Sequence, residues 1–272
     1  MRKAYTVVLL ALLACAAAFG QSWNYDPNTP IGPLSWGFLG GYNAFATCGT
    51  DKQAVGLRQA PINIVTAGLK PSGLPSITFR YKSTPLVVEN LGRVVEVENE
   101  TDNSGILVGL ELADTYQLVQ FHFHTPSEHK IDGVADQMEL HLVHQNALGE
   151  LAVVGVLLKV DNTKANPVFD EIFNNAPYLF FHQTATNDTH LKINPVDMLP
   201  KTHTYYNYSG SLTTPPCSEG VRWYVLTQPA FVSSKAVAIY QGLLSQSPLN
   251  NYYPFNARPT QLLNDRPVLV SK

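Results

Sequence analysis

The stretch Gln120-Phe121-His122-Phe123-His124 alternates polar and aromatic side chains. Successive side chains of a β-strand point to opposite faces, so both histidines project from one face and both phenylalanines from the other. Two imidazoles placed in this way can grip one metal ion. The alternation therefore predicts a strand that carries two candidate metal ligands, His122 and His124.

A second stretch, residues 139–144, repeats the alternation and puts Glu139, His141 and Val143 on one face. If the two strands are neighbours, His141 supplies a third nitrogen. Five of the eight histidines gather in this region: His122, His124, His129, His141 and His144. We expect His129 and His144 to be hydrogen-bonded core residues, because neither has a clear metal geometry.

Three imidazoles with an open fourth position are typical of catalytic zinc, whereas structural zinc usually has four ligands rich in cysteine. The few cysteines of this chain lie far apart, which argues against a structural site. Ligating histidines also need acceptors for their second nitrogens, and Gln120 and Glu139 each lie two residues before a candidate ligand. The alternative, a set of core histidines bonded to backbone, stays open, but the two polar partners favour a site for one Zn²⁺ ion.

The composition predicts one domain, mainly β in the α+β class. The chain has 272 residues, 45% of them hydrophobic, which suits one large core. Its net charge is −3 and it has no basic run, so we expect no nucleic acid partner. Strand-like runs lie at residues 76–81, 86–89, 93–98, 116–124, 139–145 and 151–160. Helical periodicity is clear only at residues 166–174 and 233–244.

The N-terminus is typical of a secretory signal peptide. A basic start is followed by an apolar run over residues 4–19 and then by small residues, which places cleavage after Gly20 and the mature domain at 21–272. A buried helix or a membrane anchor is the alternative, but the run is short for a membrane span. We therefore expect an exported protein without a membrane anchor.

Export affects the cysteines and three sequons. Cys15 leaves with the signal, so Cys48 and Cys217 remain, and one disulfide or two free thiols fit that number. Sequons for possible N-linked glycans occur at Asn99, Asn187 and Asn207.

The motifs resemble the α-carbonic anhydrase family. The resemblance covers nearly all of the mature chain and rests on residues 23–25, 58–64, 121–129, 139–144, 210–219 and 258–261. It implies a central, mostly antiparallel, twisted sheet of about ten strands with a few short peripheral helices. It also implies reversible hydration of CO2 to bicarbonate and a proton by hydroxide on a zinc ion, and inhibition by sulfonamides and small anions.

The resemblance also implies roles for individual residues. His122, His124 and His141 would hold the zinc, while Thr213 would accept a hydrogen bond from the hydroxide and donate one to Glu128. Thr214 matches a position that touches bicarbonate, and exported members join the cysteines that match Cys48 and Cys217. The apolar wall for CO2 corresponds to Val143, Val153, Leu212, Val221 and Trp223.

One position departs from the family pattern. Fast members carry a histidine after a glycine to ferry the proton away, but here Gly92 is followed by Arg93. A guanidinium does not release its proton near neutral pH, so Arg93 is a non-functional substitution for the shuttle. We expect buffer, or another group such as His182, His190 or His203, to carry the proton.

Two rival functions remain at this stage. The pattern also fits a binding or storage protein of the same fold with little activity, or a zinc esterase, since zinc hydroxide attacks several carbonyls. The complete set of three histidines with Thr213 and Glu128 argues against the storage interpretation.

Overall fold

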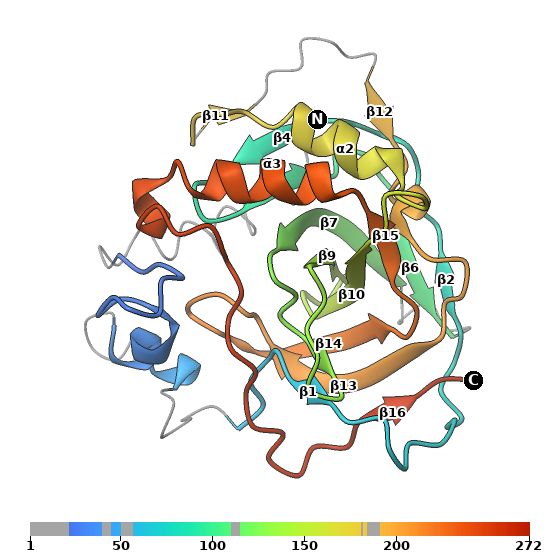
Figure 1. Ribbon diagram of the computed structural model, residues 1–272. Coiled ribbons are helices and arrows are strands. Elements are labelled where there is room, and N and C mark those ends of the chain that lie inside the picture. The colour runs from blue at the N-terminus through green and yellow to red at the C-terminus, as the bar shows by residue number, and fades with distance from the viewer. Residues whose placement is uncertain (1–21, 40–44, 50–56, 110–114, 181, 184–190) are drawn as a thin grey trace.

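Three long strands form the middle of the chain: β7 (Thr115–His124), β9 (Met138–Gln145) and β10 (Leu151–Val160). They belong to a computed structural model that describes residues 22–39, 45–49, 57–109, 115–180, 182–183 and 191–272. The expected signal peptide, residues 1–20, lies outside the described residues. Figure 1 shows that the three strands are enclosed by the rest of a strongly curled sheet.

The sheet has twelve strands in the order β11-β4-β5-β7-β9-β10-β14-β13-β16, with β15 beside β10 and the pair β6 and β2 extending from β7. The other nine strands are β2 (Ile77–Phe79), β4 (Val88–Asn90), β5 (Val95–Glu98), β6 (Gly105–Val108), β11 (His182–Gln183), β13 (Tyr205–Ser211), β14 (Glu219–Leu226), β15 (Ala230–Val232) and β16 (Leu269–Val270). Among its described pairings, only β10 with β14 and β10 with β15 are parallel. The predicted mainly β, mostly antiparallel sheet is confirmed.

Two short ladders lie outside this sheet. They join β1 (Asn63–Ile64) to β8 (Lys130–Ile131) and β3 (Thr84–Pro85) to β12 (Lys192–Ile193). The 3-10 helices are η1 (Pro33–Phe38), η3 (Ala46–Cys48), η5 (Pro195–Met198) and η6 (Pro248–Asn250).

The two predicted α-helices are present as α2 (Pro167–Asn174) and α3 (Ser234–Leu244). Each begins one residue later than predicted, because the first residue of the pattern is the N-cap. Asn166 accepts a hydrogen bond from the N–H of Val168, and Ser233 accepts one from the N–H of Ala236. Neither is long and apolar enough to cross a membrane, and the same holds for every helix in the described ranges.

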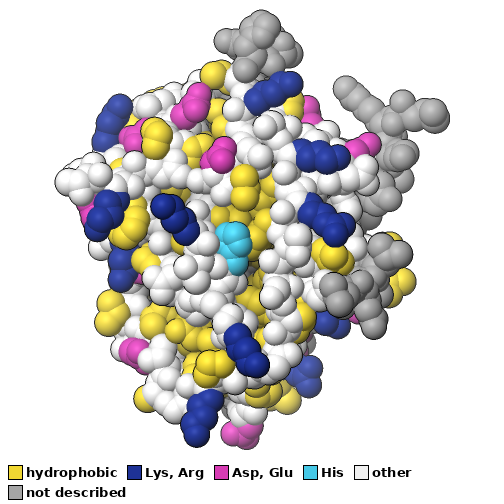
Figure 2. Space-filling view, turned by 90° about the vertical axis from the view of Figure 1, so that its right-hand side faces the viewer, with side chains coloured by type: hydrophobic (Ala, Val, Ile, Leu, Met, Phe, Trp, Pro, Cys, Tyr) yellow, Lys and Arg dark blue, Asp and Glu magenta, His cyan; other side chains and the backbone are white. Residues whose placement is uncertain are grey.

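The surface carries dispersed charge on the side that Figure 2 shows. Lys and Arg side chains lie apart from one another there, among acidic, polar and hydrophobic side chains. The described part of this face therefore has no continuous basic stripe of the kind that binds nucleic acid.

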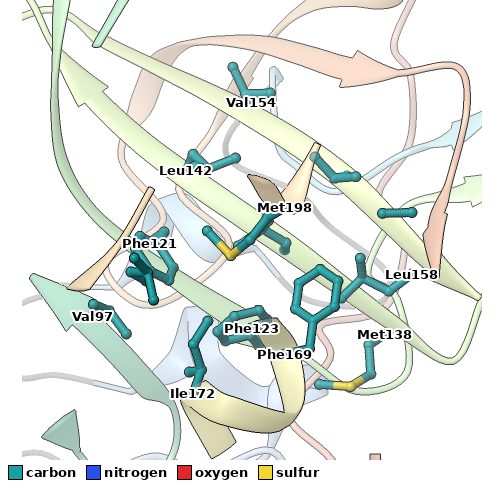
Figure 3. Packing of buried hydrophobic residues seen from close by; sticks show 14 of the residues in the cluster. Val97, Phe121, Phe123, Met138, Leu142, Val154, Leu158, Phe169, Ile172 and Met198 are labelled. Atoms are coloured by element: carbon teal, nitrogen blue, oxygen red, sulfur yellow. The ribbon is translucent and has the colours of Figure 1, made fainter. Parts of the chain in front are cut away.

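The face of the sheet toward α2 and α3 forms the main core. Phe121 and Phe123 of β7 are fully buried there, and Phe123 packs edge to face against Phe169 and Phe173 of α2. Figure 3 shows the rings of Phe121, Phe123 and Phe169 together with aliphatic side chains of the neighbouring strands. The predicted alternation of β7 is confirmed, since the phenylalanines anchor the strand and leave the opposite face to the histidines.

The opposite face carries a smaller apolar cluster that includes Val143, Val153 and Trp223. Gly155 lies opposite His141 in the ladder between β9 and β10. A Cβ at this glycine would come within 3.0 Å of Glu139 Oε1, so the glycine leaves room for that carboxylate.

The expected disulfide between Cys48 and Cys217 is present, and both cysteines are buried. They pack with Trp23, Tyr25 and Trp36 in a third cluster, whose buried members other than Cys217 come from the N-terminal part of the chain. The bond joins residues 169 apart and ties the loop after β13 to this N-terminal cluster.

The packing of the core predicts that two phenylalanine-to-alanine variants differ strongly in stability. Phe123→Ala should lower the free energy of unfolding by about 3–5 kcal/mol, because it leaves a cavity at a fully buried site. Phe38→Ala is the matched control, since Phe38 is 78% exposed and its loss should cost less than about 0.5 kcal/mol. Denaturant unfolding measures both, and equal effects would contradict this assignment of the core.

Candidate metal centre

Three imidazoles meet on the face of the sheet away from the helices. Ring centroids lie 5.1 Å apart for His122 and His124, 5.3 Å for His122 and His141, and 4.6 Å for His124 and His141. The strand register explains this, because β7 pairs with β9 so that His122 lies opposite His141. One ring nitrogen from each histidine lies within 4.8 Å of the other two, which is close enough to hold one metal ion.

The second nitrogen of each ring is held by an acceptor. His122 Nδ1 donates to Gln120 Oε1 at 2.8 Å, His124 Nδ1 to the carbonyl oxygen of Asn256 at 2.7 Å, and His141 Nε2 to Glu139 Oε1 at 3.0 Å. Each remaining nitrogen, namely Nε2 of His122, Nε2 of His124 and Nδ1 of His141, therefore keeps its lone pair.

One buried nitrogen without a hydrogen-bond partner shows whether a metal ion fits the site. His124 Nε2 is buried and has no hydrogen-bond partner within the described residues, and a buried nitrogen of this kind is costly unless something binds it. His122 is only partly buried, so the cluster opens to solvent on that side. The donor set of three neutral imidazoles with an open side suits zinc.

Burial keeps the three rings neutral. Loss of solvent, together with the charge of neighbouring His141, lowers the pKa of His124 to about 3. Burial also lowers the pKa of His122 and of His141, in the case of His141 against the opposing effect of Glu139. Neutral imidazole is the form that coordinates a metal.

Glu139 organises the layer behind His141. Its Oε2 accepts from the backbone N–H groups of Glu128 and His129 at 2.9 and 2.8 Å, and its Oε1 also accepts from His129 Nδ1 at 2.7 Å. Burial alone would raise the pKa of this carboxyl, but His129 and His141 bring it well below its usual range. His129, Glu139 and His141 also lie close enough together to hold a metal ion. However, His129 Nδ1 and Glu139 Oε1 are already hydrogen-bonded to each other.

The two histidines predicted to be core residues are both buried and hydrogen-bonded. His129 Nε2 lies 2.6 Å from the hydroxyl of Tyr208, while His144 Nε2 lies 2.9 Å from the hydroxyl of Tyr81.

Gln120 has a second partner that the sequence did not reveal. Its Nε2 donates to Glu96 Oε2 at 2.8 Å, and Glu96 is only 3% exposed. Burial raises the pKa of Glu96 to about 8, with smaller contributions from Glu89 and Glu98. The alternation of β5 puts Glu96 on one face. The ladder between β5 and β7 sets Glu96 opposite His122, and only the three-dimensional structure shows that its side chain bonds Gln120.

Glu128 and Thr213 lie beside the histidines. Glu128 Oε1 accepts from the backbone N–H of Arg258 at 2.8 Å and lies 3.4 Å from His124 Nδ1, whereas its Oε2 is buried without a hydrogen-bond partner in the described structure. Burial raises the pKa of this carboxyl, and the Thr213 hydroxyl acts in the opposite direction. Thr213 therefore approaches the carboxyl without completing a hydrogen bond of normal geometry.

The residues expected to form an apolar wall lie together. Val143, Val153, Val221 and Trp223 belong to one buried cluster, and Leu212 packs against it. The ring of Trp223 lies 4.9 Å from that of His141, so this cluster borders the imidazoles. Thr214 is partly buried in the same loop as Thr213, and its carbonyl accepts from the N–H of Cys217.

Arg93 is held by contacts with Trp23. Its Nε donates to the carbonyl of Trp23 at 2.7 Å, and its guanidinium lies 4.6 Å from the centre of the Trp23 ring. Burial lowers its pKa only to about 10, so it stays charged at neutral pH. Among the alternatives, His203 is exposed against Phe79, and His190 lies outside the described residues.

Two residues near the C-terminus support the centre and were missed as site residues. Asn256 holds His124 through its backbone, while its side-chain amide donates to the carbonyls of Arg93 and Phe123. The Arg258 guanidinium donates to the carbonyls of Ala60 and Cys48 and to Gln59 Oε1. The Arg that opens the motif at 258–261 was the available sequence signal for the second residue, and the structure shows that it is buried.

The structure describes the asparagines of two of the three sequons. Asn99 Nδ2 donates to the carbonyls of Thr101 and Leu118, and Asn207 Nδ2 donates to the carbonyl of Trp223. Asn187 lies outside the described residues.

Comparisons with known proteins agree with this geometry. The family model of eukaryotic-type carbonic anhydrase matches residues 43–272. A carbonic anhydrase of Nostoc sp. (strain PCC 7120) is 35% identical over 258 residues, covering 93% of this chain and 88% of that protein. Proteins named in this way are lyases.

Solved structures share the fold. The α-carbonic anhydrase of Thermovibrio ammonificans in complex with the inhibitor sulfanilamide has a TM-score of 0.78 at 33% identity, over 92% of this chain and 99% of that one. Dioscorin complexed with ascorbate has a TM-score of 0.73 at 27% identity, over 92% and 98%. The family model matches residues 43–272, and a 35% identical relative matches 93% of this chain, so the chain belongs to the α-carbonic anhydrase family.

Proposed function

We propose that the protein is a zinc enzyme that reversibly hydrates CO2 to bicarbonate and a proton. One observation carries the proposal: three imidazoles converge, each with one nitrogen bound to an acceptor and the other free. His122 and His124 would bind zinc through Nε2, and His141 through Nδ1. Zinc bound there would make a water molecule acidic enough to supply hydroxide at neutral pH.

The chain's own residues would then orient the reactants. Thr213 can accept one hydrogen bond and donate another, and the free Oε2 of Glu128 beside it is the acceptor that the geometry offers. A Thr213 hydroxyl that donates its proton to Glu128 can only accept a hydrogen bond from the nucleophile. This hydrogen bond fixes the direction in which the nucleophile's lone pair points. Orientation of this kind lowers the barrier without requiring a new contact to the metal.

CO2 is apolar and suits the wall formed by Val143, Val153, Leu212, Val221 and Trp223. The wall adjoins His141 through Trp223, so a molecule against it would lie beside the metal. Thr214, next to Thr213, is placed to contact the polar product, bicarbonate.

We further propose that the protein is exported, with residues 1–20 as the signal peptide and 21–272 as the catalytic domain. The buried disulfide supports this, because disulfides persist in oxidising compartments.

The alternative of a binding or storage protein deserves a direct test, since dioscorin, which shares the fold, was solved in complex with ascorbate. We expect the purified protein to contain one zinc ion per chain, to hydrate CO2 in stopped-flow measurements and to be inhibited by sulfanilamide and small anions. Protein that takes up no zinc and has no hydratase activity would favour storage. Full zinc with ester hydrolysis but no CO2 hydration would favour the esterase.

Removal of one imidazole should release the metal. His122→Ala, His124→Ala and His141→Ala should each lose most zinc and nearly all activity, because two imidazoles leave the ion under-coordinated. Metal analysis after dialysis measures this, with exposed His203→Ala as the control that keeps its zinc. Full zinc and full activity in any of the three variants would exclude that residue as a ligand.

Thr213→Ala should lower turnover by about 100-fold while zinc content stays normal, because the change misorients the nucleophile and removes no ligand. Thr213→Ser is the matched control, since it keeps the hydroxyl and should retain much of the turnover. Normal turnover in Thr213→Ala would remove Thr213 and Glu128 from the mechanism.

Turnover in dilute buffer should be limited by proton transfer and should rise with added imidazole, because the Arg93 guanidinium stays charged. Arg93→His should raise turnover in dilute buffer and weaken its dependence on imidazole. Stopped-flow assays across imidazole concentrations measure both effects. A wild-type protein that is fast in dilute buffer and indifferent to imidazole would reveal a different internal shuttle.

A further inference from the structure

The three acceptors behind the imidazoles are chemically unequal. Glu139 offers a carboxylate to His141, and Asn256 offers a backbone carbonyl to His124, and neither group can present an N–H in the same place. Gln120 offers a side-chain amide to His122, and an amide has a donor end and an acceptor end of nearly the same shape. Only this one of the three contacts can be reversed by a rotation.

Reversal would disable His122 as a ligand. If the amide of Gln120 turned over, its N–H would face Nδ1 of His122, and that nitrogen would have to accept. The proton of the neutral ring would then sit on Nε2, the nitrogen that faces the other two imidazoles. A protonated Nε2 has no lone pair for a metal.

Glu96 is placed to prevent the reversal. It lies opposite His122 in the ladder between β5 and β7, and its Oε2 accepts the N–H of Gln120 at 2.8 Å. A reversed amide would set Gln120 Oε1 against an oxygen of the ionised carboxyl, acceptor against acceptor, at a site that is only 3% exposed. Because burial raises the pKa of Glu96 to about 8, the carboxyl is ionised and excludes the reversal at pH 9, where the tests below are made.

We propose that Glu96 is a positioning residue that fixes the amide of Gln120 and, through it, the metal-binding tautomer of His122. The inference rests on the proposed function, in which His122 holds zinc. Glu96 acts without touching the metal, and its contribution is to the retention of zinc and to the state of the ring before zinc arrives.

The experiment, at pH 9, compares Glu96→Leu, which removes the acceptor, with Glu96→Gln, whose amide can satisfy Gln120 in either orientation. We expect zinc release to a chelator to be about tenfold faster in Glu96→Leu, at the low end for loss of a hydrogen-bonded partner near a metal. Glu96→Gln should also release zinc faster than the wild type, because its own amide can turn over and no longer fixes the direction of the Gln120 amide. Glu98→Leu is the matched control, since Glu98 is a half-buried acid two residues along the same strand.

A double-mutant cycle separates positioning from general stability. In a Gln120→Leu background the Glu96→Leu change should no longer alter zinc release, because the amide through which it acts is gone. Equal effects of Glu96→Leu in both backgrounds would overturn the proposal.

The tautomer of His122 provides a readout that needs neither zinc nor activity. In metal-free wild-type protein, nitrogen NMR of the histidines should find the proton of His122 on Nδ1, and Glu96→Leu should shift it toward Nε2. A wild-type ring protonated on Nε2 would overturn the proposal even if Glu96→Leu failed to fold. Failure of the wild type to bind zinc would instead sink the proposed function, which this measurement does not use.

Discussion

The register between β7 and β9 is the constraint on which the centre depends. It sets His122 opposite His141 and carries His124 to the same side. A slip of one residue would turn Phe121 and Phe123 out of the core and the histidines into it, so the apolar packing on one face fixes the geometry on the other. The polar centre is therefore as well defined as the core behind it.

Around this frame, hydrogen bonds connect distant parts of the chain to the imidazoles. Asn256 holds His124, Arg258 holds Glu128 through its backbone, and the Arg258 guanidinium reaches the carbonyl of Cys48. The disulfide joins Cys48 to Cys217, close in sequence to Thr213. The N-terminal cluster, the loop after β13 and the C-terminal segment are thus connected to one another around the site.

The sequence predicted what depends on local pattern. Alternation identified the strands and both faces of β7 and β9, and Asn166 and Ser233 marked the starts of the helices. Contacts between residues far apart in the sequence could not be predicted. His124 is hydrogen-bonded to the carbonyl of a residue 132 positions away in the sequence, and Gln120 to Glu96, 24 positions away. The weakly patterned strand β13, Tyr205–Ser211, was also missed, because its Asn, Ser and Gly residues favour turns.

The central claim is that zinc lies between Nε2 of His122, Nε2 of His124 and Nδ1 of His141. Crystals of the zinc-loaded protein, with anomalous scattering recorded at the zinc edge, test it most directly. The account predicts one strong peak about 2.0–2.1 Å from each of these three nitrogens. A peak among His129, Glu139 and His141, or an imidazole bound through the other nitrogen, would contradict it.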